Sequence, residues 1–170
     1  GPARAAFIAG DSAGGGLTLS TLLALRDRGR RLPLGAMPLS ACTDLTLSGQ
    51  SLRTEPDPIC SARAMPDFAR LYLGQASPRD PLASPLFGDY TGMPPLLLQV
   101  GQHEMLRDDS VRVAARARSA GVDVTLEVWP GNTRLIAGLA AGLVAWRTRS
   151  ALLTIAVGML LLWILDGTLG

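Results

Sequence analysis

Gly-Asp-Ser-Ala-Gly-Gly, residues 10–15, is the stretch of sequence that decides the fold. A short apolar run, residues 5–9, precedes it, and an apolar stretch with helical spacing, residues 17–25, follows it. This order predicts a strand, a sharp turn and a helix that stops near Gly29. The serine in the middle, Ser12, would then occupy the turn itself.

The spacing Gly10-x-Ser12-x-Gly14 fits a nucleophile elbow, in which a serine hydroxyl projects from a strained turn. The glycines would let strand and helix approach without clashes between Cβ atoms. The backbone N–H of Ala13 would point at the oxyanion of a tetrahedral intermediate. The alternative is a plain turn, but the strand before it and the helix after it favour the elbow.

Asp11 and Gly15 complete the elbow. Asp11 either tunes the nucleophile beside it or acts as an ordinary hydrogen-bonding residue of the loop, and the sequence leaves both readings open.

The chain continues as an alternation of strands and helices up to residue 131. Strands are predicted over residues 34–41, 96–100 and 122–129, and helices over residues 67–73 and 108–120. The segments between them, residues 42–66 and 78–95, are punctuated by proline and read as irregular connections. The fold class is therefore α/β, with a mostly parallel sheet and flanking helices.

Composition excludes several function classes. All 16 basic residues are arginines scattered along the chain, and the net charge is only +2, which argues against a nucleic-acid partner. Without lysine the glycine-rich stretch cannot be a Walker phosphate loop. Two cysteines and one histidine give no metal-type spacing. No signal peptide is visible, so a cytoplasmic location is the default expectation.

Four motifs together resemble the hormone-sensitive-lipase family of bacterial esterases, the α/β-hydrolase fold-3 group. They are residues 10–15, Asp-Pro-Leu-Ala-Ser-Pro-Leu at 80–86, Pro-Pro-Leu-Leu-Leu-Gln-Val-Gly at 94–101, and Glu104 with Leu-Arg-Asp-Asp at 106–109. The resemblance covers residues 1–131. It implies a carboxylic ester hydrolase that acts on short or medium acyl esters through an acyl-enzyme, needs no cofactor, and carries a mobile cap.

The resemblance also implies an acid that orients the catalytic histidine. The family places this acid just after the strand equivalent to residues 96–100, where Glu104 stands, with Asp108 as a reserve. The alternatives are a solvated loop residue for Glu104 and a helix cap for Asp108. A loop near the site contains Asp80 and Ser84, for which turn and capping roles are expected.

The sequence departs from the family pattern at the position of the catalytic base, a histidine. The family's histidine follows a Trp-Pro-Gly turn in a Gly-x-x-His-x-Phe pattern, whereas residues 129–131 are followed here by Asn-Thr-Arg-Leu-Ile. The one histidine, His103, lies in the loop of the acid. The His-Gly-Gly-Gly oxyanion loop and the first strands would precede residue 10, and we expect them to be missing. The sequence thus predicts a partial, nearly inactive hydrolase, unless a partner chain supplies the base.

With Val-Ala-Trp-Arg-Thr-Arg at 144–149 and Gly-Met-Leu at 158–160, residues 132–165 resemble the last two transmembrane segments of an AzlD-type branched-chain amino-acid exporter small subunit. Two apolar segments, 135–146 and 151–165, are separated by Arg-Thr-Arg-Ser. The longer one falls short of the roughly 20 residues that cross a bilayer. The expected domains are a partial hydrolase, residues 1–131, and a hydrophobic helical tail, residues 132–170. The tail would contact a membrane or form a buried hairpin, and the second function hypothesis is a non-catalytic, membrane-associated fragment or fusion.

Overall fold

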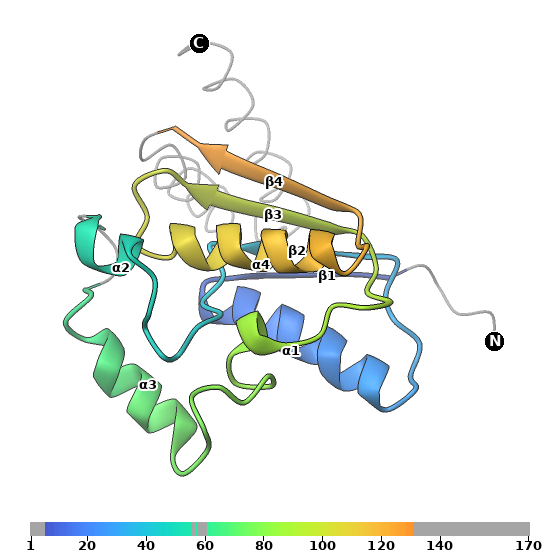
Figure 1. Ribbon diagram of the computed structural model, residues 1–170, viewed down its shortest axis with the longest axis horizontal. Coiled ribbons are helices and arrows are strands. Elements are labelled where there is room, and N and C mark those ends of the chain that lie inside the picture. The colour runs from blue at the N-terminus through green and yellow to red at the C-terminus, as the bar shows by residue number, and fades with distance from the viewer. Residues whose placement is uncertain (1–5, 56, 58–60, 131–170) are drawn as a thin grey trace, which may run out of the picture. The chain divides into compact units, whose positions relative to one another are not determined.

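The computed structural model describes residues 6–55, 57 and 61–130 (Figure 1). The chain divides into two units, Gly1–Val128 and Trp129–Gly170, and the described residues lie almost wholly in the first. In that unit the strands are β1 (Phe7–Asp11), β2 (Gly35–Leu39), β3 (Leu96–Gly101) and β4 (Val124–Trp129). They form one sheet in the order β1-β2-β3-β4, and both β1 with β2 and β2 with β3 pair in parallel.

Helices connect these strands. The bounds are α1 (Ala13–Asp27), α2 (Ser51–Thr54), α3 (Met65–Leu73), the 3-10 helix η1 (Pro85–Phe87) and α4 (Arg107–Ser119). Both α1 and α4 run along one side of the sheet in Figure 1, and residues of both belong to the same buried apolar cluster. This face of the sheet therefore carries the main core.

The spacing of apolar residues explains how α1 is oriented. Leu19, Leu22 and Leu23 follow the i, i+3, i+4 pattern of one helix face, and each is about 1% exposed. They meet β3, whose Leu98 is fully buried, and Val113 of α4. Burying side chains of this size is worth about 1.5 to 3 kcal/mol each, so this layer fixes the strand ends that bear the candidate site.

The predicted α/β fold is confirmed, and every strand and helix predicted before residue 131 is present. The bounds differ by a few residues: α1 starts at Ala13, immediately after the turn, because the glycines and Ala13 add no apolar periodicity to mark it. Two short elements inside the predicted irregular connections, α2 and η1, were missed. Four and three residues are too few for a periodic pattern to be detected.

The predicted segments 135–146 and 151–165 lie outside the described residues. Within the part of the chain that is described, no helix has the length and apolar character needed to span a bilayer.

Candidate active site

Ser12 stands in the turn between β1 and α1, as the sequence predicts, with φ 57° and ψ −118°. Positive φ is costly for a residue with a side chain. Backbone hydrogen bonds hold it there: its N–H donates to Leu39 O at 2.9 Å, and its carbonyl accepts from Cys42 N at 3.0 Å and Gly16 N at 3.2 Å. The turn is thus bonded both to β2 and to the first turn of α1.

The glycines around Ser12 differ in how much space a side chain would have. A Cβ on Gly10 would lie 2.2 Å from the carbonyl oxygen of Gly14. A Cβ on Gly15 would lie 2.8 Å from the Cβ of Ala41, which follows β2. A Cβ on Gly14 would meet nothing within 4 Å, so the expectation that this glycine prevents a clash is wrong. A further close approach lies at Gly16, outside the predicted motif, where a Cβ would lie 2.2 Å from Cys42 O.

The amino end of α1 lies directly behind Ser12. Ala13 is the first residue of this 15-residue helix, and the Ser12 side chain makes no capping hydrogen bond to it. The first turn contains no acidic residue. The free N–H groups and the dipole at a helix start favour negative charge. Asp11, the last residue of β1, is exposed.

Glu104 lies in the turn that follows β3. Its N–H donates to Gly101 O at 3.2 Å, and its Oε2 accepts a hydrogen bond from Ser40 Oγ. Because β1, β2 and β3 are parallel, Ser12, Ser40 and Glu104 follow neighbouring strand ends at the same edge of the sheet. The carboxyl edge of a parallel sheet is where α/β proteins place their sites.

Asp108, the reserve candidate, binds α2 instead. Its Oδ2 accepts from Ser51 N at 2.9 Å, and its N–H donates to Ser51 Oγ at 3.0 Å. Burial raises the pKa of Asp108, but hydrogen bonds from the Ser51 and Gln50 backbones and from Arg107 outweigh it, so this pKa lies below its usual value. Asp108 therefore binds the start of α2, and the expected cap of its own helix is absent, since α4 has no side-chain capping bond.

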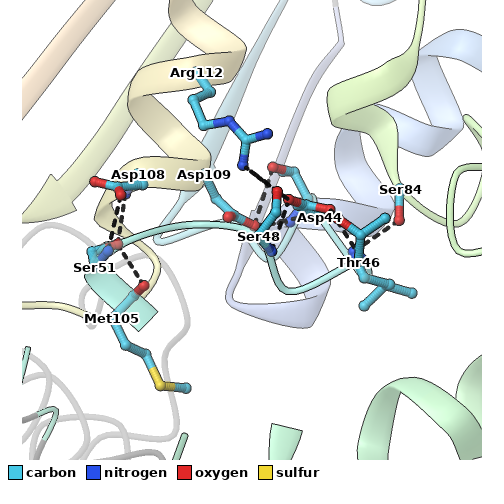
Figure 2. A network of polar contacts seen from close by, with 11 residues as sticks. Asp44, Thr46, Ser48, Ser51, Ser84, Met105, Asp108, Asp109 and Arg112 are labelled. Carbon is cyan, nitrogen blue, oxygen red and sulfur yellow. Dashed lines mark hydrogen bonds and ion pairs between the residues drawn. The ribbon is translucent and has the colours of Figure 1, made fainter. Parts of the chain in front are cut away.

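A buried polar network that the sequence did not predict lies beside α4 (Figure 2). Asp109 is 6% exposed, and its Oδ2 accepts from Thr43 N at 2.7 Å and Asp44 N at 2.9 Å. Burial, with a smaller contribution from the nearby Asp44 charge, raises the pKa of Asp109 to about 6. Asp109 therefore fixes the segment that follows β2.

Asp44 is the second acid of this network, and its side chain is fully buried. It accepts hydrogen bonds from Thr46 N at 2.9 Å, Ser48 Oγ at 2.5 Å and Arg112 Nη1 at 2.9 Å. Burial raises the pKa of Asp44. Hydrogen bonds from Ser48, Thr46 and Arg112 together lower it by more, so this pKa lies below its usual value. Hydroxyl residues two and four positions after an aspartate are a turn signal that could have revealed this loop.

Asp80 has the turn role expected of it, because its Oδ1 accepts from Leu82 N at 2.8 Å. Ser84 precedes η1, but its side chain makes no capping bond there. Its Oγ accepts instead from Leu45 N at 2.9 Å, 39 residues away in sequence.

His103 occupies the turn after β3, in the loop position expected from the sequence. Its Nδ1 lies 3.2 Å from Glu55 Oε2, and Arg107 Nη1 donates to Glu55 Oε1 at 3.2 Å. Glu55 was not foreseen, because it follows α2 and is 48 residues away in sequence. Among the described residues no group of three or more His, Cys, Asp or Glu side chains could hold a metal ion.

Known proteins resemble both parts of the chain. Residues 2–136 match the family described as alpha/beta hydrolase fold, and residues 119–166 match the branched-chain amino acid transport protein AzlD. The two matches overlap over residues 119–136. The described residues of that overlap include β4, which belongs to the hydrolase sheet.

Curated relatives include an acetyl-hydrolase from Streptomyces hygroscopicus, 45% identical, with 72% of this chain and 42% of the relative covered. An esterase from Acinetobacter venetianus is 39% identical, with 74% and 42% covered. The chain therefore spans less than half the length of these relatives.

Solved structures agree. An esterase from the bacterial hormone-sensitive lipase family is 37% identical, with a TM-score of 0.75, and 96% of this chain and 53% of that chain are covered. The chain belongs to the α/β-hydrolase family, in its hormone-sensitive-lipase group.

Proposed function

We propose that Ser12 is the nucleophile and Glu104 the acid of a carboxylic ester hydrolase that acts on small-molecule esters. The observation that carries this proposal is the positive φ of Ser12 at the start of a 15-residue helix. A base would take the Ser12 proton as Oγ attacks the ester carbonyl carbon, and the Ala13 N–H would bind the oxyanion. The same base would return that proton to the leaving alkoxide, which departs as an alcohol. Water would then hydrolyse the acyl-serine and release the carboxylic acid product. The relatives named acetyl-hydrolase and esterase support this reaction class.

The proton of Ser12 needs a base. The family pattern Gly-x-x-His would place the histidine at position 134, which is arginine here and lies outside the described residues. The single histidine, His103, contacts Glu55 instead. A serine hydroxyl without a base is a weak nucleophile, so this polypeptide alone should turn over slowly.

Hydrolysis of p-nitrophenyl butyrate tests the proposal. The purified 170-residue chain should act barely above background, and Ser12→Ala should change that little. Added imidazole can stand in for the base, and we expect it to raise the rate about tenfold over the imidazole-only reaction, a small part of the factor of roughly 10² to 10⁴ that a positioned base gives.

Two site variants and one control variant give this assay its specificity. Ser12→Ala and Glu104→Gln should each abolish the imidazole-dependent increase, whereas Asp108→Asn, at the acid that binds α2, should retain it. The proposal fails if Ser12→Ala shows the same imidazole-dependent rate as the parent chain, or if the parent chain turns over robustly without imidazole.

A second candidate function follows from the AzlD match over residues 119–166. We propose that residues 132–170 form a separate segment that associates with membranes, with the hydrolase unit, residues 1–131, as a scaffold. The chain should then float with phosphatidylcholine vesicles in a density gradient, whereas the chain cut after residue 131 should stay at the bottom. Equal flotation of both would contradict this proposal. Fluorophosphonate labelling of Ser12 would favour the hydrolase over the scaffold.

A further inference from the structure

We propose that Ser40 is a positioning residue that holds the Glu104 carboxylate in place for a base. This inference rests on the proposed role of Glu104 as the acid. Ser40 directly follows β2, between the strand ends that carry Ser12 and Glu104, and it is 8% exposed. Its Oγ donates a hydrogen bond to Glu104 Oε2, and its own N–H donates to Gln99 O at 2.8 Å. The backbone of Ser40 is thus bonded to β3, and its side chain is bonded to the acid.

Ser40 has a backbone conformation that is unfavourable for a residue with a side chain. Its φ of 41° lies in the left-handed region, which costs a residue with a Cβ about 1 to 2 kcal/mol. Glycine would satisfy this backbone demand at lower cost. What the serine adds at this position is its hydroxyl, and the described partner of that hydroxyl is Glu104.

Gly101 leaves room for the same carboxylate. A Cβ on Gly101 would lie 2.7 Å from Glu104 Oε1, so the carboxylate rests against bare backbone. Oε2 is therefore bonded by the residue after β2, and Oε1 occupies space that a side chain at the end of β3 would otherwise fill. An acid fixed in this way can orient the tautomer of an imidazole, which is the task of the acid in a serine triad.

Ser40→Gly tests the inference because it removes the hydroxyl and also relieves the backbone. The variant should melt at the same temperature as the parent chain or higher. Its imidazole-dependent hydrolysis of p-nitrophenyl butyrate should nevertheless fall about tenfold, a change in kcat with KM nearly constant. Ser119→Ala, a serine whose Oγ bonds Ala115 O on the exposed side of α4, is the matched control and should keep both values.

A crystal structure of Ser40→Gly supplies a readout that needs no activity. Displacement of the Glu104 carboxylate from its place against Gly101 supports the inference, and a carboxylate that stays in place overturns it. Activity lost together with a lower melting temperature would assign Ser40 a structural role and also overturn it. If Ser12→Ala or Glu104→Gln keeps the imidazole-dependent rate, the proposed function itself fails. If both lose that rate while Ser40→Gly keeps it and the carboxylate stays in place, only the role of Ser40 fails.

Discussion

Gly10→Ala should lower the free energy of unfolding by about 3 kcal/mol, the upper part of the range for overpacking a closed site. The added methyl group would lie 2.2 Å from the carbonyl oxygen of Gly14 and 2.8 Å from Thr18 Oγ1. The carbonyl belongs to the first turn of α1, which cannot withdraw without breaking the contacts of Leu19 and Leu22 with the core. The strain therefore separates β1 from α1 at the turn that contains Ser12.

Gly14→Ala is the matched control, because the two glycines flank Ser12 at equal spacing. Its new methyl group would meet nothing within 4 Å, and residue 14 is helical. Replacing a helical glycine by alanine should raise the free energy of unfolding by about 0.5 kcal/mol. Urea denaturation of both variants, with unchanged m-values, measures the difference. Equal destabilisation by the two substitutions would contradict this account of the turn.

The same pair shows how far the sequence could determine the turn. Strand, turn and helix followed from local signals, since the apolar run, the glycines and the periodic stretch are adjacent in the chain. The spacing Gly10-x-Ser12-x-Gly14 treats its glycines alike, although only Gly10 has a close neighbour. Clearance depends on how β1 meets α1 in space, and the spacing does not contain that information.

At the acid site, too, the sequence predicted one part and not the other. Glu104 could be selected because the family pattern places an acid a fixed distance after a strand. Ser40, which donates to it, is 64 residues away in sequence, and Asp109 is 66 residues from Thr43. No periodic or motif signal links residues so far apart. Asp109 in particular looked like an ordinary acid in the first turn of a helix, and only its burial distinguishes it.

That buried acid gives the second large effect. The pKa of Asp109 is raised from 3.8 to about 6, mainly by burial, so the folded state binds its proton more tightly than the unfolded state does. The stability this gives is fully present below about pH 4 and is lost as the pH rises through 6. At 1.36 kcal/mol per pKa unit, the loss amounts to about 3 kcal/mol.

Asp109→Asn removes this titration, since an amide carbonyl can still accept the hydrogen bonds from Thr43 N and Asp44 N. We expect the variant to be more stable than the parent chain by about 2 to 3 kcal/mol at pH 8 and nearly equal to it at pH 4. Urea unfolding of both proteins at several pH values gives this difference directly, and taking the difference cancels the titration of all unchanged groups.

Asp108→Asn, one position earlier, should behave in the opposite sense. The lowered pKa of Asp108 means that its ionised form stabilises the fold above about pH 4, and that this stability is lost as the pH falls below that value. Asp108→Asn should therefore be less stable than the parent chain at pH 7, with a difference that shrinks toward pH 3. If Asp109→Asn also lost stability at pH 8, the hydrogen bonds from Thr43 and Asp44 would outweigh burial. Asp109 would then be an ionised anchor of the segment after β2 at neutral pH.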